Sequence, residues 1–368
     1  VIGVAGPMSG PLAHAGKQYR DAVSLAAKEI NARGGLNGAK IRVVTADDQA
    51  TPKTAVTAAN QLVAQNATIV VGHYNSTPTL AASTIYTRND ILLIAPQAII
   101  GKLTDNKAWN VFRLGPRDDD QAAAAIQYLA RRAQTASEGQ FAKRIALVHD
   151  TSTFARKLDD LAVKELKDLG LDPALRGEIP PGTRQSRSIA SLLASRITSA
   201  KIGAVYWTGG STEAGQFLTA LRTRNSKALF IGTEALASAD FINGMSGTIA
   251  SGVRMTSPAS GTVEPAATVI FKKLSLAEST QDKAPAITAY AAMQVVIQAA
   301  RIAASNSPRK IAATLHSGRM FLTVTGSVSF DEKGDRKEKL YRILRWRKAD
   351  DGKLIYGPGA AEPGSGGK

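Results

Sequence analysis

The chain opens with a strand, a loop of small residues and a helix, and this order constrains the fold more than any other feature. Residues 1–5 are apolar and predict a buried strand, which breaks at Gly6-Pro7-Met8-Ser9-Gly10-Pro11. A long amphipathic run then begins near Gly16 and ends in a glycine-rich stretch at 34–38. This is the opening βα step of a parallel α/β sheet. Because ligands of such sheets bind beyond the carboxyl ends of strands, the loop is predicted to offer its backbone N–H groups to a small anion.

Length and composition exclude several classes of protein. The chain has 368 residues, enough for two domains, and its hydrophobic and charged fractions of 44% and 21% are those of globular proteins. It contains no cysteine, which excludes disulfides and thiolate metal sites. The net charge is +16, but its lysines and arginines are scattered along helices and no nucleic-acid-binding motif accompanies them. We therefore expect a basic surface and no nucleic acid partner.

No segment of the sequence resembles a membrane span or a secretory leader. No apolar run approaches the roughly 20 residues that a spanning helix needs. Residue 1 already lies in a predicted strand, so no signal peptide is expected in the chain. A mature exported protein would have this appearance, and so would a cytosolic one.

The strand–helix alternation repeats in two series. In the first, strands are predicted at 41–46, 68–71, 91–94 and 111–114 and helices at 52–65 and 79–88. In the second, strands are predicted at 144–149, 175–179, 204–207 and 229–232 and helices at 119–132, 153–169, 185–199 and 213–223. The acidic segment at 115–120, between the two series, is interpreted as a linker.

Two such series predict an α/β protein of two doubly wound lobes. A long helix at 284–304 is apolar on much of its surface and needs a sheet to cover, for which the first lobe is the natural host. The chain would then cross between the lobes about three times, an arrangement that suits hinge closure over a ligand. We expect lobe 1 at 1–116 plus 253–326, lobe 2 at 117–252 plus 327–348, and a frayed tail at 349–368.

The sequence contains no recognisable catalytic set. It has no Walker A pattern, no dinucleotide-binding glycine motif after a strand and no nucleophile elbow. None of its four histidines pairs with another at metal-ligand spacing. We predict that the protein is not an enzyme and that it holds no metal or cofactor.

What remains is a set of polar residues that follow predicted strands. In the first lobe these are Ser9, Asn75, Ser76, Thr77 and Gln97; in the second they are Gly209, Gly210, Ser211 and Glu234, with Phe154 nearby. Ser76 and Thr77 stand at the entry of a predicted helix, where they would act as its N-cap or bind a ligand carboxylate. Glu234 follows an apolar strand, where it would lie in a solvated loop or meet a ligand ammonium or hydroxyl group.

With these residues in place, the chain resembles the type I periplasmic solute-binding proteins of ATP-driven uptake systems, and most of all their leucine/isoleucine/valine-binding branch. The resemblance covers nearly the whole length. Its motifs are Gly6-Pro7-Met8-Ser9-Gly10-Pro11, Ile30-Asn31-Ala32-Arg33-Gly34-Gly35-Leu36-Asn37-Gly38, Asp47-Asp48-Gln49-Ala50-Thr51-Pro52, Val71-Gly72-His73, Ile145-Ala146-Leu147-Val148-His149-Asp150 and Phe330-Asp331-Glu332-Lys333-Gly334-Asp335.

The resemblance implies a role for each candidate residue. It implies that Ser76, with Asn75, Thr77 and backbone groups around Gln97, Ala98 and Ile99, holds a ligand carboxylate, and that Glu234 holds an α-ammonium group. It places Phe154 as an aromatic wall, and it implies that Ala15, Gly210 and Ser211 shape the pocket for the ligand side chain. It also implies a periplasmic, monomeric protein that delivers its solute to the membrane permease of an ABC transporter.

Two departures from the amino-acid binders leave the ligand open. Ile99 stands where they have a threonine, and Gly210-Ser211 replaces a tyrosine-rich loop. Ile99 has no side-chain hydrogen-bonding group, so part of the expected ammonium site is missing. The ligand is expected to be a small apolar amino acid, favoured because Glu234 is present, or an amine-free aromatic or hydrophobic carboxylate of the benzoate kind. A cytosolic ligand-sensing regulator on the same fold is the further alternative.

Overall fold

The structure is a computed structural model and describes residues 1–135, 144–243, 245, 247–258, 265–276, 283–338 and 340–358. It divides into two compact units, each made of separate stretches of the chain. Unit 1 comprises residues 1–117 and 259–340, and unit 2 comprises residues 118–258 and 341–368. The chain therefore passes between the units at 117/118, 258/259 and 340/341.

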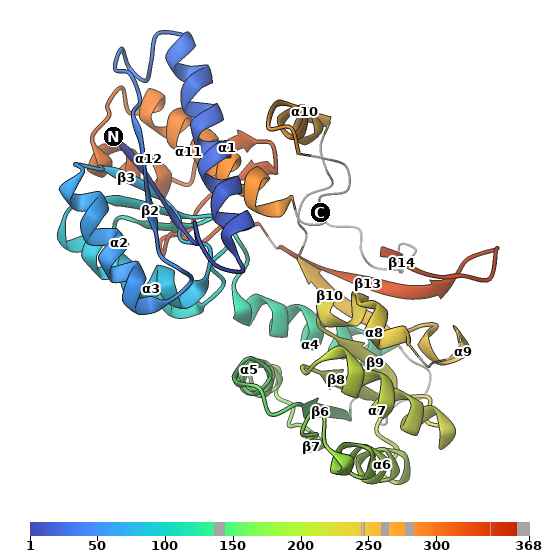
Figure 1. Cartoon of the computed structure of the whole chain (residues 1–368). Coiled ribbons are helices and arrows are strands. Elements are labelled where there is room, and N and C mark those ends of the chain that lie inside the picture. Colours follow the sequence, from blue (N-terminus) through green and yellow to red (C-terminus); the bar gives the residue numbers. More distant parts are fainter. Residues whose placement is uncertain are drawn as a thin grey trace. The chain divides into compact units, whose positions relative to one another are not determined.

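Unit 1 is a parallel sheet covered by helices on both faces (Figure 1). Its five strands, in the spatial order β2-β1-β3-β4-β5, are β1 (Ile2–Gly6), β2 (Val43–Asp47), β3 (Ile69–Val71), β4 (Leu92–Ala95) and β5 (Val111–Arg113). Its helices are α1 (Ala13–Ala32), α2 (Pro52–Ala64), α3 (Ser76–Arg88), the short η1 (Gly101–Leu103), α10 (Pro265–Lys273), α11 (Ala284–Ile302) and α12 (Pro308–His316). A hairpin of β11 (Phe321–Thr323) and β12 (Gly326–Val328) completes it.

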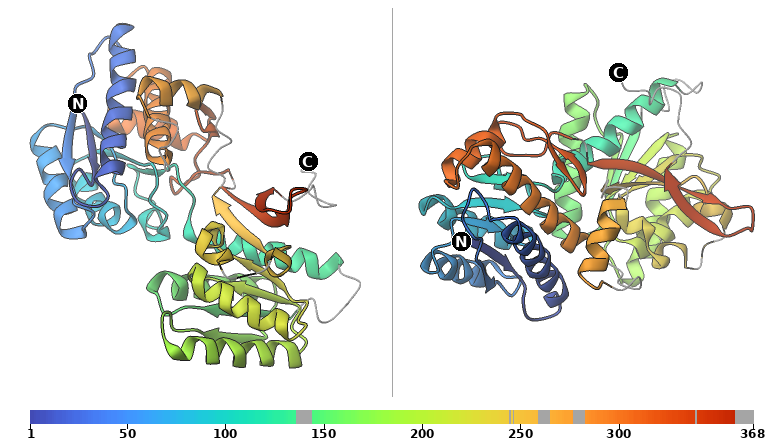
Figure 2. Two further views of the ribbon diagram at one scale, coloured as in Figure 1. Left: turned by 45° about the vertical axis from the view of Figure 1, so that its right-hand side comes forward. Right: turned by 90° about the horizontal axis from the view of Figure 1, so that it is seen from above.

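Two apolar layers form the core of unit 1. On one face of the sheet α1 and α11 lie side by side and pack against β1, β3 and β4 (Figures 1 and 2). On the other face α2 and α3 supply small side chains such as Ala58 and Ala82 together with Leu62 and Tyr86. The expectation that the long apolar helix near 284–304 covers the first sheet is confirmed, because most of the α11 side chains are buried there.

Unit 2 has a larger, mixed sheet (Figure 2). Its seven strands, in the order β14-β13-β10-β9-β8-β6-β7, are β6 (Ile145–His149), β7 (Leu175–Glu178), β8 (Ala204–Trp207), β9 (Leu229–Gly232), β10 (Arg254–Pro258), β13 (Tyr341–Lys348) and β14 (Leu354–Pro358). Strands β6 to β10 are parallel to one another, whereas β13 pairs antiparallel with β10 and β14 antiparallel with β13 at one edge. Its helices are α4 (Asp118–Thr135), α5 (Thr153–Asp168), α6 (Arg184–Ser199), α7 (Ser211–Thr223), η3 (Glu234–Ala237), α8 (Ala239–Ile242) and α9 (Gly247–Ala250).

Helices also cover both faces of this second sheet. Helices α6 and α7 pack on one face, around Trp207 and Phe217, and α4 and α5 pack on the other, around Ile126 and Leu158. The predicted α/β class with two doubly wound lobes is thus confirmed. None of the described helices is long and apolar enough to cross a membrane.

The unit boundaries differ from the predicted lobes at the second and third crossings. Strand β10 belongs to unit 2 because it pairs with β9, so the chain leaves that unit after Pro258 rather than before residue 253. The segment 327–340, expected in lobe 2, belongs to unit 1, where Gly334 O accepts from Arg113 N. The expectation of a frayed tail from residue 349 is wrong for Leu354–Pro358, which pairs with β13; residues 359–368 lie outside the described ones.

Shortening a buried side chain of α11 tests the packing of unit 1. Met293 is fully buried between the helices and the sheet, so Met293→Ala should lower the free energy of unfolding by about 2–5 kcal/mol through lost contacts and a cavity. On the same helix Ile302 is 49% exposed, and Ile302→Ala should cost about 0.5 kcal/mol or less. Urea denaturation of both variants measures the difference, and equal losses would contradict the packing described.

Candidate functional site

The carboxyl edge of the unit 1 sheet carries the polar segment Asn75-Ser76-Thr77. Helix α3 begins at Ser76, three residues before its predicted start, and Pro78 fits there because a first-turn N–H has no intrahelical acceptor. Asn75 is therefore the N-cap residue, but its side chain makes no capping hydrogen bond. Within the described residues its buried Oδ1 has no hydrogen-bond partner. Ser76 is partly exposed and Thr77 is exposed at the start of this helix.

The segment after β4 lies against this helix start. The backbone N–H of Ile99 donates to Ser76 Oγ at 3.0 Å. Two residues earlier, Gln97 Oε1 accepts from the hydroxyl of Tyr19 on α1 at 3.3 Å, and Tyr19 meets the ring of Tyr74 edge-on. The structure thus brings Asn75, Ser76, Gln97 and Ile99 together at one edge of unit 1.

Two other predicted site residues of unit 1 are fully buried. Ala15 lies inside α1 and Ala98 belongs to the core on the α2–α3 side of the sheet. Neither side chain is open to a solute in this structure, although Ala98 O takes part in a polar network described below.

The loop after β1 is engaged by a carboxylate of the chain. Asp47, at the end of β2, accepts from Met8 N at 2.8 Å, from Ser9 Oγ at 2.6 Å and from Gln49 N at 2.9 Å. Burial raises the pKa of Asp47, but these hydrogen bonds outweigh it and hold that pKa below its usual value. The expectation that this loop offers its N–H groups to an anionic ligand is wrong for Met8, whose N–H is taken by Asp47.

A buried row of three polar side chains holds the strand ends of unit 1 in place. His73 Nδ1 lies 2.6 Å from Asp48 Oδ2, and His73 Nε2 lies 2.9 Å from the hydroxyl of Tyr86. All three residues are fully buried. Asp48 also accepts from Ala50 N at 2.8 Å, so the row connects the ends of β2 and β3 to α3.

In unit 2 a carboxylate likewise organises the strand ends. Asp150, after β6, accepts from Ser152 N and from Gly210 N, each at 2.8 Å. Gly210 O in turn accepts from Trp207 Nε1 at 2.9 Å. These bonds set the starts of α5 and α7 beside each other, with Gly210 as the N-cap residue of α7 and Ser211 as its first residue. Phe154, in the first turn of α5, is 42% exposed although it is a large apolar side chain.

Glu234 follows β9 and opens η3. Its Oε2 accepts from Gln121 Nε2 at 2.6 Å, and the same Gln121 nitrogen donates to Thr256 Oγ1 at 3.1 Å. The residue keeps an exposed surface, so a solute can reach it. The protein around its carboxyl group nevertheless raises the pKa of Glu234, because partial desolvation outweighs the hydrogen bonds from its own backbone and from Gln121.

Several residues at these two edges escaped the sequence analysis. Gln121 is fully buried next to Glu234, and its Oε1 has no hydrogen-bond partner among the described residues. Tyr206 is buried close by, and burial followed by the Glu234 carboxylate raises the pKa of its hydroxyl well above the usual value. Gln121 could have been considered from the sequence, because it lies one turn inside the helix that follows the linker. Tyr19 and Tyr206 gave no such signal, since buried aromatic residues on a helix or strand usually fill a core.

Each unit carries polar groups of its own at the carboxyl edge of its sheet. Unit 1 presents a hydroxyl, an amide and backbone N–H groups at the start of a helix, which suit an anion. Unit 2 presents a carboxylate whose charged form is disfavoured and an exposed aromatic ring. In the described parts of the chain no three histidine or acidic side chains gather as metal ligands.

Residues 1–353 match the family described as periplasmic binding protein. This chain belongs to that family. The "Leu/Ile/Val-binding protein homolog 1" of Brucella abortus is 33% identical over 356 residues, which cover 97% of this chain and 92% of the relative. The predicted family and its fold are thus confirmed, and with them the prediction of a non-enzymatic solute-binding protein.

Two solved structures share the periplasmic binding protein fold. One is the branched-chain amino acid transporter substrate-binding protein of Streptococcus pneumoniae in complex with isoleucine, with a TM-score of 0.64, 23% identity, and coverage of 96% of this chain and 97% of that one. The other is a solute-binding protein of an ABC transporter from Rhodopseudomonas palustris in complex with 3,4-dihydroxybenzoic acid, with a TM-score of 0.65, 20% identity, and coverage of 97% and 95%.

The pH dependence of stability tests the environment of Glu234. A carboxyl group with a raised pKa binds its proton more tightly in the folded state, so its contribution to stability falls as pH rises through and above the unfolded value of about 4.3. Compared with the wild type, Glu234→Gln should therefore become relatively more stable as the pH rises from about 4 to about 7.

Glu178→Gln is the matched control, for which the opposite pH dependence of stability is expected. The hydrogen bond from Arg156 lowers the pKa of Glu178, so this variant should become relatively less stable over the same pH range. Chemical denaturation across the pH series gives both slopes. A Glu234→Gln slope of the same sign as the control would contradict the environment assigned to Glu234.

Proposed function

We propose that this protein is the substrate-binding component of an ABC uptake transporter and that it binds a small apolar amino acid. It would act in the periplasm and deliver the solute to a membrane permease. The observation that carries the proposal is the complementary chemistry of the two units: carboxylate-binding groups at the α3 start of unit 1, and a reachable, partly desolvated carboxylate beside an exposed phenylalanine in unit 2.

The carboxylate of the ligand is assigned to unit 1. Ser76 Oγ already accepts from Ile99 N, so its own hydroxyl proton can be donated to an anion. Thr77 is exposed beside it in the first turn of α3, where the helix dipole favours negative charge. The buried Oδ1 of Asn75 has no hydrogen-bond partner among the described residues, so the amide group of Asn75 adds an unused acceptor and NH2 donors beside Ser76.

The amino group of the ligand is assigned to Glu234. A carboxylate that the protein partly desolvates is costly to keep charged, and an ammonium group placed against it offsets that cost. Gln121 holds Glu234 Oε2 from the protein side, which orients the carboxyl group. Phe154, Gly210 and Ser211 would then contact the apolar side chain of the ligand.

An amine-free carboxylate is the second candidate, and Ile99 is the observation that favours it. Its side chain is partly exposed and apolar at the edge where Ser76 lies, so it adds no hydrogen bond to an amino group. The structure of the Rhodopseudomonas palustris protein, which has the same fold, contains 3,4-dihydroxybenzoic acid, a carboxylate without an amino group. Glu234 would then meet a ligand hydroxyl group, or hold a proton itself, which its raised pKa favours.

A small ligand panel distinguishes the two candidates. L-Leucine or L-isoleucine at about 100 times Kd should stabilise the protein by about 2.7 kcal/mol in thermal unfolding, while 4-methylpentanoate and benzoate should do far less. Glu234→Gln should weaken leucine binding about 10- to 100-fold, since it removes a charge-assisted contact, and Glu178→Gln should leave it unchanged. Stabilisation by benzoates and none by amino acids would contradict the first candidate and support the second. Calorimetry with Glu234→Gln and Glu178→Gln measures the change in ligand affinity.

Binding should also make the protein more compact, because one solute would contact groups of both units. Small-angle scattering is expected to show a smaller radius of gyration with saturating ligand than without it. Ser76→Ala with Glu234→Gln, at the same ligand concentration, should retain the profile of the free protein. Identical profiles for free and liganded wild type would contradict closure of the units on the ligand.

A further inference from the structure

A fully buried arginine of unit 1 holds the segment after β4 through hydrogen bonds to its carbonyl groups. Arg113, the last residue of β5, donates through Nη1 to Ala98 O at 3.3 Å and to Ile100 O at 2.8 Å. These carbonyl groups flank Ile99, whose N–H donates to Ser76 Oγ. The guanidinium group therefore contacts the segment 98–100 on the side away from Ser76.

The geometry of the peptide bond explains how these hydrogen bonds from Arg113 orient the N–H groups of the segment. In a trans peptide the C=O and the N–H of one planar unit point in opposite directions. Ala98 O and the N–H of Ile99 belong to the same unit, so Arg113 on one side directs that N–H toward Ser76 on the other. The same reasoning applies to Ile100 O and the N–H of Gly101.

A buried carboxylate holds the arginine in place. Arg113 Nε donates to Asp335 Oδ1 at 2.8 Å, and Thr104 Oγ1 lies between them, 2.5 Å from Arg113 Nη2 and 2.8 Å from Asp335 Oδ1. Asp335 itself is fixed by a turn in which its N–H donates to Asp331 Oδ1 at 2.9 Å. Arg113, Thr104 and Asp335 are all buried, so the planar fork of the arginine cannot rotate freely.

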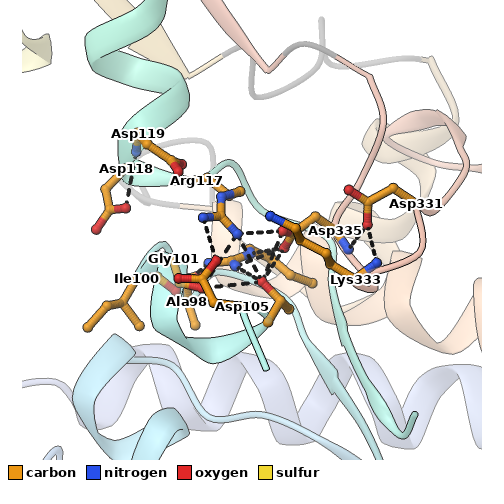
Figure 3. Close-up of polar contacts among 12 residues, drawn as sticks. Ala98, Ile100, Gly101, Asp105, Arg117, Asp118, Asp119, Asp331, Lys333 and Asp335 are labelled. Atoms are coloured by element: carbon orange, nitrogen blue, oxygen red, sulfur yellow. Dashed lines mark hydrogen bonds and ion pairs between the residues drawn. The ribbon is translucent and has the colours of Figure 1, made fainter. Parts of the chain in front are cut away.

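A second arginine extends the cluster to the first chain crossing. Figure 3 shows Arg117 facing Asp335, with Gly101 and Asp105 beside it. Arg117 Nη1 donates to Asp335 Oδ2 at 2.6 Å and reaches Gly101 O at 3.5 Å, and Arg117 Nη2 pairs with Asp105 at 2.9 Å. Two guanidinium groups thus share the buried carboxylate of Asp335, and Arg117 also pairs with the half-exposed Asp105.

We propose that Arg113, held by Asp335 and supported by Arg117, is a positioning residue that aims the Ile99 N–H at Ser76 Oγ and so leaves the Ser76 hydroxyl proton free to be donated to the ligand carboxylate. It does not itself touch the ligand. The proposal rests on the proposed function for the identity of that anion, but the orientation of the peptide is a property of the free protein. The proposal therefore attributes the preference for a carboxylate ligand to the buried cluster of Arg113, Asp335 and Arg117.

Replacement of the arginine by lysine tests this role in the full-length chain. Arg113→Lys keeps the charge opposite Asp335 but has one nitrogen instead of a fork, so it cannot hold both carbonyl groups. Amide hydrogen exchange of Ile99, followed by NMR in the ligand-free protein, should become about 10-fold faster or more. The ratio of affinities for L-leucine and L-leucinamide, which lacks the carboxylate charge, should fall about 10-fold.

Arg336→Lys is the matched control. Arg336 lies one residue from Asp335, but its side chain pairs with Glu338 and donates to Ser327 O instead of contacting the segment 98–101. It should change neither the Ile99 exchange rate nor the affinity ratio. Should Arg113→Lys fail to fold, Arg117→Lys carries the test, with a smaller change in the same direction because the hydrogen bond from Arg117 to Gly101 O is long, at 3.5 Å.

The outcomes separate the inference from the proposed function. Faster Ile99 exchange in Arg113→Lys and not in Arg336→Lys supports the positioning role, whatever the ligand proves to be. Unchanged exchange in a folded Arg113→Lys, or an unchanged affinity ratio in a protein that binds leucine, overturns it. Wild-type protein that binds no carboxylate of the panel overturns the proposed function and leaves the exchange measurement as the test of orientation.

Discussion

The buried ion pair between Arg113 and Asp335 is the interaction on which the polar edge of unit 1 depends. It joins residues separated by 222 positions, and both are almost completely removed from water. A buried pair of this kind is stable only when every remaining donor and acceptor is satisfied. Here the requirement is met by Thr104, by the carbonyl groups of Ala98 and Ile100, and by Arg117. The same bonds that satisfy the charges also fix the segment after β4.

Both units build their strand ends by one physical principle: a carboxylate accepts backbone N–H groups of a neighbouring loop. Asp47 does so for the loop after β1, and Asp150 does so for the loop after β8. Such bonds fix a loop without a large apolar core. The loop after β1 is also packed tightly against α1, where Gly16 lies so close to Pro7 O that any side chain there would collide with it.

The arrangement of helices and strands could be predicted from sequence because it depends on local patterns. Alternating apolar runs and glycine-rich ends fixed the parallel sheets, and the apolar surface of α11 indicated its host. The antiparallel strand β14 was missed because its residues are mostly exposed and lie in a glycine- and proline-rich tail. The boundary at residue 258 was missed because strand pairing, not composition, assigns β10 to unit 2.

The candidate site was predicted only in part, for the same reason. Ser76 and Glu234 follow apolar strands and could be found from position alone. Asp335 and Arg113 could not, since their pairing joins residues 222 positions apart that no local pattern connects. Ala15 illustrates the opposite error: a small residue near a predicted site was assigned a lining role, whereas the packing of α1 buries it.

Unit 1 is built from two stretches that are far apart in the chain, and this has a consequence for biosynthesis. Its sheet is complete by residue 113, but α11, which covers one face, begins only at residue 284. A nascent chain therefore carries a partly uncovered apolar sheet surface through the synthesis of residues 118–258, and the contacts that close it are of long sequence separation and slow to form. Unit 1 can reach its native packing only after residue 302, the end of α11, has been synthesised.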